Sequence, residues 1–95
     1  MNLDFEWDEA KANTNLRKHG LSFEEVRTVF ADPLAKVFPD EWQSRGERRE
    51  IIIGHLPDGR LVLVVFSERQ GGRIRIISAR PATPKEKRDY DRHAR

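Results

Sequence analysis

Apolar residues recur every three or four positions after Ser22, which predicts an amphipathic helix. The repeating positions are Phe23, Val26, Val29 and Phe30. Ser22 and Glu25 form the S-x-x-E capping box that marks many helix starts. Asp32-Pro33 ends the pattern, because proline disfavours helical backbone in the residue before it.

Two further helices are indicated by their ends. Asp8 is a suitable N-cap for a helix over Glu9–His19, and Gly20 stands where a left-handed residue ends many helices. Thr83 begins a T-x-x-E capping box with proline at the first helical position, and this last helix runs to about residue 93.

Between these helices the period changes to that of strands. Short runs rich in β-branched residues alternate with turn sequences that contain glycine. The expected strands are Ala35–Phe38, Glu47–Leu56, Leu61–Phe66 and Arg73–Ala79, while Phe5–Trp7 is either an edge strand or a lead-in. Short connections favour an antiparallel meander of three to four strands. We therefore expect an α+β fold with two N-terminal helices and one C-terminal helix, in a single domain over residues 1–95.

Composition narrows the possible classes of protein. The chain has 95 residues and no cysteine, which excludes disulfides, thiolate catalysis and cysteine-ligated metals. Its longest apolar run, Leu61–Phe66, is far too short to span a membrane. The N-terminus lacks the basic and apolar stretches of a signal peptide, so we expect a cytoplasmic protein.

Positive charge gathers toward the C-terminus although the formal net charge is only +2. Residues 73–95 carry eight basic and three acidic side chains, whereas residues 1–42 carry five and nine. This asymmetry predicts either a basic face for a polyanion or simply a solvated helix. The candidate phosphate contacts are Arg73, Arg75, Lys85, Lys87 and Arg88.

Familiar cofactor and metal motifs are absent from the sequence. The three histidines are scattered and no H-x-H or H-x-x-x-H pair exists. There is no G-x-G-x-x-G, no phosphate-binding P-loop and no serine in a nucleophile elbow. We therefore expect no metal and no cofactor.

Two charged residues extend apolar strand faces. Strict alternation places Glu68 with the apolar face of Val62 and Val64, and places Ser78 and Arg80 with that of Ile74 and Ile76. Two interpretations remain open and are compatible. Glu68 and Arg80 form a partly buried ion pair, or they line a cleft in which Arg80 clamps a phosphate.

Motifs at both ends of the chain resemble the BrnT-type toxin family. The opening motifs are FEWD at residues 5–8, KHG at 18–20 and SFEE at 22–25. The run RIRIISARPATPKEKRDY at residues 73–90 resembles that family's closing signature. Pro81 departs from the family pattern, in which a basic residue often follows the arginine.

The resemblance implies a RelE-like fold and a ribonuclease toxin of a type II toxin–antitoxin module. It also implies a BrnA-type antitoxin partner with a ribbon-helix-helix DNA-binding part. The toxin–antitoxin complex would repress its own operon, so DNA would be contacted only through the antitoxin. RNA is the implied substrate, and no membrane is involved.

On this basis we expect a metal-independent endoribonuclease that inhibits translation. RNA cleavage through the 2′-hydroxyl needs a base, an acid and cations on the phosphate. The candidates are Arg80 and Arg69 for the phosphate, Glu68 or His19 as base, and Tyr90 or Lys18 as acid. The structural alternatives are a core anchor for Tyr90 and helix-end capping for Lys18 and His19. The functional alternative is a non-catalytic nucleic-acid-binding or co-repressor module.

Two aromatic residues in a polar stretch are candidates for antitoxin binding. Phe38 and Trp42 flank Pro39-Asp40-Glu41, where large apolar side chains are costly to expose. The alternative is that both side chains fold back onto the core of the domain.

Overall fold

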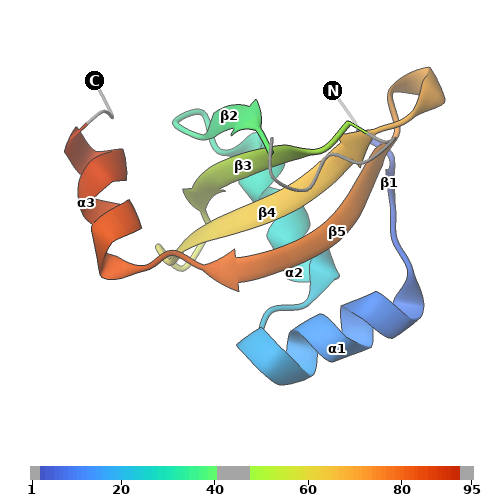
Figure 1. Cartoon of the computed structure of the whole chain (residues 1–95), viewed down its shortest axis with the longest axis horizontal. Helices are drawn as coiled ribbons and strands as arrows, with labels where there is room; N and C mark the ends of the chain where they lie inside the picture. Colours follow the sequence, from blue (N-terminus) through green and yellow to red (C-terminus); the bar gives the residue numbers. More distant parts are fainter. Residues whose placement is uncertain (1–2, 41–47, 93–95) are drawn as a thin grey trace.

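The computed structural model describes residues 3–40 and 48–92 (Figure 1). Their elements in chain order are β1 (Phe5–Glu6), α1 (Glu9–His19), α2 (Phe23–Val26), the 3-10 turn η1 (Arg27–Ala31), β2 (Lys36–Pro39), β3 (Glu50–His55), β4 (Leu61–Glu68), the 3-10 turn η2 (Gln70–Gly72), β5 (Ile74–Pro81) and α3 (Pro84–Arg92). No helix in these two ranges is long and apolar enough to cross a membrane. The α+β class and the order of the three helices are as the sequence predicts.

The sheet has five strands in the order β1-β5-β4-β3-β2. Strands β2 to β5 form the expected antiparallel series. The predicted sheet of three to four antiparallel strands is nevertheless too small, because Phe5–Glu6 adds an edge strand parallel to β5. Two residues carry too little pattern to predict a strand partner, so the sequence could not specify this mixed sheet.

The helix ends follow the local signals. The Asp8 carboxylate accepts a hydrogen bond from the Lys11 backbone N–H at 3.1 Å, and Gly20 adopts φ 69° at the C-cap. Ser22 and Glu25 form the complete capping box. The helix that follows is α-helical only through Val26 and then tightens into η1, so its predicted extent is divided between two helical forms.

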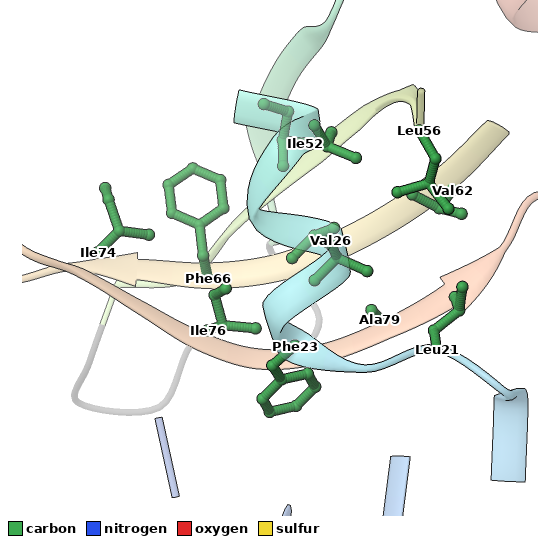
Figure 2. Close-up of a cluster of buried hydrophobic side chains, with 12 residues drawn as sticks. Leu21, Phe23, Val26, Ile52, Leu56, Val62, Phe66, Ile74, Ile76 and Ala79 are labelled. Carbon is green, nitrogen blue, oxygen red and sulfur yellow. The ribbon is translucent and has the colours of Figure 1, made fainter. Parts of the chain in front are cut away.

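Most of the core lies between the sheet and α2, as Figure 2 shows. Phe23 and Val26 from α2 are almost completely buried against β3, β4 and β5. Phe30 joins this cluster through edge contacts with Phe5 and Phe66 at ring-centroid distances of 5.2 and 5.1 Å. The apolar face that the sequence predicts for the helix after Ser22 is thus the face that packs against the sheet.

A bulge in β5 changes which of its residues share a face. Phe66 pairs with Ile76 and Val65 pairs with Ser78, so Ile77 is an extra residue in β5. Ile74 and Ile76 join the α2-side core, whereas Ser78 and Arg80 lie on the opposite face of the sheet. The predicted alternation through Arg80 is therefore wrong beyond Ile76.

The opposite face is covered at one end by α3. Tyr90 is 5% exposed and packs with Ile53, Leu61 and Leu63 in a second, smaller apolar cluster. Its hydroxyl donates a hydrogen bond to the Leu34 carbonyl at 2.8 Å. This single side chain connects α3 to the sheet and to the segment before β2.

Gly54 of β3 lies close to Val29 of η1 and to the segment that follows it. A Cβ atom at this position would be 3.0 Å from Ala35 Cβ, 3.0 Å from Val29 Cγ1 and 3.1 Å from Asp32 Oδ2. We expect Gly54→Ala to lower the free energy of unfolding by about 1–3 kcal/mol through overpacking, measured by urea denaturation. The second substitution Ala35→Gly should recover part of the loss, and an unchanged urea midpoint in Gly54→Ala would contradict this packing.

Candidate active site

Residues of α1 lie beside β5 at the bulge. A groove of about 450 Å³ runs between them, and Lys11, Thr14, Lys18 and His19 line its helical side. On the strand side the groove is lined by Ile77 and Ser78. The bulge therefore brings residues of β5 next to the cationic end of α1.

A second hollow of about 110 Å³ adjoins this groove and shares His19 and Ser78 with it. Arg80 lines the same hollow, whose remaining walls include Leu63 and Val65. His19 and Arg80 are thus brought to one cavity although sixty residues separate them in the chain. Ser78 lines both the groove and the hollow and was not among the site residues predicted from the sequence.

Asn15 fixes the position of α1 against β5. It is 7% exposed, donates a hydrogen bond to the Leu21 carbonyl at 3.1 Å, and accepts one from the Ala79 N–H at 3.0 Å. β1 pairs with Ile74 and Arg75 at one edge of β5 and does not extend as far as Ala79. The Asn15 side chain therefore accepts the hydrogen bond that a neighbouring strand would accept from the Ala79 N–H. The only sequence signal for this role is a polar residue at a helix position that faces the core.

Arg80 is held in a two-bond ion pair with Glu86 at the start of α3. Nη1 and Nη2 each donate to one Glu86 carboxylate oxygen at 2.8 Å. The same carboxylate accepts from the Thr83 N–H at 2.8 Å, which completes the predicted capping box. Arg80 therefore has a fixed orientation, as bidentate guanidinium–carboxylate pairs commonly give.

Hydrogen bonds from the Arg80 guanidinium, aided by the Thr83 N–H, lower the Glu86 pKa from 4.5 to about 2 despite partial burial. A depressed carboxyl pKa in the folded state adds stability above pH 4.5, and this contribution is lost as the pH falls toward 2. We expect the stability difference between the parent and Glu86→Gln to shrink over this range. Urea denaturation at successive pH values measures it, and a constant difference would contradict the coupling.

Tyr90 is placed as a core anchor rather than as an open proton donor. Its hydroxyl already donates to Leu34, and burial, with Asp32 and Asp91 nearby, raises the Tyr90 pKa. Its ring lies edge-on to His55 at 5.4 Å. Of the two alternatives for Tyr90, the geometry favours the structural one.

Asp32 and His55 form a polar contact, close to Tyr90 of α3, that the sequence did not predict. The Asp32 carboxylate accepts from the His55 backbone N–H at 2.7 Å and lies 3.3 Å from Nδ1. Burial opposes ionisation of Asp32, but hydrogen bonds from the His55 and Leu34 backbone lower its pKa overall. This contact joins η1 to β3 and explains His55 as a structural residue.

Glu68 and Arg69 lie at the other end of the sheet from Arg80. Leu63 pairs with Arg80 and Glu68 pairs with Ile74, so five residues of β4, roughly 17 Å, separate the two positions. The predicted Glu68–Arg80 ion pair is therefore wrong. The geometry also gives no support to Glu68 and Arg69 as direct partners of Arg80 in one reaction.

The candidate phosphate contacts fall into two groups. Arg73 and Arg75 pair with Glu6 on β1 at 3.3 and 2.9 Å, and Arg69 lies 3.9 Å from the same carboxylate. The three α3 candidates Lys85, Lys87 and Arg88 are exposed, and Lys85 pairs with Asp89 one turn later. The basic third of the chain thus forms two separate surfaces.

Of the two aromatic candidates for antitoxin binding, Phe38 is the one within the described residues. Phe38 lies on edge strand β2, is 43% exposed, and borders a hollow of about 270 Å³ beside Tyr90. It does not fold into the core, so that alternative is wrong for Phe38. Trp42 lies outside the described residues.

No group of three histidine, aspartate or glutamate side chains within residues 3–40 and 48–92 is arranged to hold a metal ion. The side chains at the groove and the hollow that can transfer protons or bind anions include His19, Lys18, Ser78 and Arg80.

Comparison with known proteins assigns the family. Residues 7–86 match the profile of the ribonuclease toxin BrnT of type II toxin–antitoxin systems. The chain belongs to the BrnT family. The crystal structure of the Brucella abortus ribonuclease toxin BrnT superimposes with a TM-score of 0.70 at 31% identity. That match covers 86% of this chain and 99% of the Brucella chain, and the search of curated proteins finds no match.

The matched region of this BrnT-family chain spans every element from α1 to the start of α3. It contains Lys18, His19, Ser78, Arg80 and Glu86, so both sides of the cavity lie within the family region. The resemblance suggested by the end motifs is thereby confirmed.

Proposed function

We propose that this BrnT-family toxin is a metal-independent endoribonuclease that cleaves RNA by attack of a 2′-hydroxyl on the adjacent phosphorus. The observation that carries the proposal is the cavity shared by His19 and Arg80. In the reaction the 2′-oxygen bonds to phosphorus and the bond to the 5′-oxygen breaks. The products are a 2′,3′-cyclic phosphate and a 5′-hydroxyl.

Arg80 stabilises the negative charge that gathers on the phosphate in the transition state. Its guanidinium is already oriented by Glu86, so little reorganisation is needed when the substrate binds. A cation that is fixed in place and partly desolvated stabilises the charge on the phosphate more strongly than a fully solvated cation does, which supports this role for Arg80.

Proton transfer is assigned to the end of α1. His19 takes the proton from the 2′-hydroxyl, since imidazole is the commonest proton-transfer group in enzymes and His19 lines the hollow with Arg80. Lys18, which lines the adjoining groove, gives a proton to the departing 5′-oxygen. The exposed lysines and arginine of α3 hold the RNA backbone through phosphate contacts.

The direct test is RNA cleavage by purified protein in EDTA. The proposal expects cleavage of RNA, no cleavage of DNA of the same sequence, and no effect of EDTA. Loss of cleavage in EDTA would contradict metal independence, and binding of RNA without cleavage would support the rival, a binding or co-repressor module.

The biological setting follows from the family. A type II toxin has an antitoxin partner, and we infer that here it is of the BrnA type with a ribbon-helix-helix part. RNA cleavage in the cytoplasm would inhibit translation, and binding of operator DNA would pass through the antitoxin. The RelE-like relationship stays a prediction. Expression without antitoxin should arrest growth, whereas continued growth would indicate a toxin that has lost activity.

A further inference from the structure

A cluster of charge lies at the edge of the sheet, away from His19 and Arg80. It consists of Arg69, Arg73 and Arg75 around Glu6, and we call it the Glu6 arginine cluster. Within residues 3–40 and 48–92, Arg73 and Arg75 both pair with one carboxylate, that of Glu6, and the Arg73 side chain is 56% exposed. The cluster therefore presents guanidinium groups to an outside anion.

β1 is also held by contacts that do not involve these arginines. The Ile74 N–H donates to the Asp4 carbonyl at 2.8 Å, and Phe5 packs on Phe30 from the other face of the sheet. The turn before β5 is closed by a backbone hydrogen bond from Arg69 to Arg73 at 2.7 Å. Arg73 and Arg75 thus place two guanidiniums at the Glu6 carboxylate in addition to these contacts.

The cluster and Arg80 lie on the same face of the sheet. Arg75 pairs with Ser67 and Arg80 pairs with Leu63, and these two β4 residues are four apart, so both arginines are on one face. Their separation along the strand is about 14 Å. A stacked single strand of nucleic acid rises about 3.4 Å per nucleotide, so about four nucleotides cover this distance.

We propose that the Glu6 arginine cluster is a second phosphate site, which binds the RNA backbone about four nucleotides from the scissile phosphate at Arg80. The inference rests on the proposed function for the identity of the polymer. Planar guanidiniums bind phosphate oxygens bidentately and keep their charge at all physiological pH values, which suits them to this role. Tight binding then requires an RNA long enough to reach both sites.

The test is the affinity of RNA oligonucleotides of two lengths for the parent and for Arg73→Gln. Fully 2′-O-methylated strands of three and ten nucleotides lack the attacking hydroxyl, so fluorescence anisotropy reports binding alone. Arg73→Gln should weaken ten-nucleotide binding about tenfold, the effect of one charge-assisted contact, and leave three-nucleotide binding unchanged. The salt dependence of ten-nucleotide binding should fall by about 0.7 in slope.

Arg27→Gln is the matched control. Arg27 also lies against β1, with its guanidinium carbon 5.9 Å from the Phe5 ring centroid, but on the helical side of the sheet. The Arg27→Gln variant should bind both oligonucleotides with the same affinity as the parent. Arg73→Lys, which keeps the charge, should restore most of the ten-nucleotide affinity and guards against a folding effect of Arg73→Gln.

Equal weakening of both lengths, or the same weakening by Arg27→Gln, would overturn the second site. Cleavage of unmodified RNA by the parent is measured separately. If the parent cleaves RNA but Arg73→Gln has no length-dependent effect on binding, the second phosphate site is refuted and the endoribonuclease proposal stands. A length-dependent effect without cleavage would refute the endoribonuclease and leave the cluster as an RNA site.

Discussion

Replacing Arg80 by alanine should lower the rate of RNA cleavage about 10²–10³-fold, the usual cost of removing one stabilising donor from the transition state. The reason is that Arg80 lines the hollow it shares with His19 and has its guanidinium oriented by Glu86. Single-turnover cleavage of a defined RNA measures the chemical step. Arg80→Lys should recover only part of the rate, because an ammonium group cannot form the two-bond pair with Glu86 that orients the cation.

The matched control for Arg80→Ala is Glu86→Gln. It removes the charge from the same ion pair and keeps the guanidinium, so it separates loss of the cation from loosening of α3. Glu86→Gln loosens the orientation of Arg80 but keeps the cation, so it should lose less cleavage activity than Arg80→Ala. If Glu86→Gln and Arg80→Ala lost the same activity, Arg80 would act only as an anchor for α3.

Replacing Asn15 by alanine should lower the free energy of unfolding by about 3 kcal/mol. The substitution leaves the Leu21 carbonyl and the Ala79 N–H without their partner, and each unpaired buried group costs about 1–3 kcal/mol. Urea denaturation gives the difference directly. Because Asn15 also fixes α1 beside β5, cleavage should fall even under conditions in which the variant is folded.

Asn13→Ala is the control for Asn15→Ala. It is the same change in the same helix, at an exposed position, and should alter stability by no more than about 0.5 kcal/mol. Equal stability of the two variants would show that the two buried hydrogen bonds of Asn15 contribute little.

The helix limits could be predicted because their signals are local. Gly20 ends α1 in the left-handed region and Ser22 begins α2, as the capping residues indicate. Lys18, His19 and Arg80 could likewise be selected from residue type and the end motifs. Their proximity could not, since it depends on how α1 docks along β5.

The arrangement of charges on the sheet could not be predicted from alternation. One extra residue, Ile77, moves Arg80 to the face opposite Ile76, and no local signal in the sequence marks a bulge there. The register also sets Glu68 against Ile74, far from Arg80. Pairing between strands is a property of the whole sheet, which explains why Glu86 and not Glu68 is the partner of Arg80.

We propose that RNA is cleaved by its own 2′-hydroxyl at a site formed by His19 and Arg80. It is tested most directly by an RNA with a single 2′-deoxynucleotide on the 5′ side of the cleaved bond, incubated with parent protein in EDTA. Cleavage at that bond should stop, while the unmodified RNA should yield a 2′,3′-cyclic phosphate end. Continued cleavage at the deoxy position would contradict it.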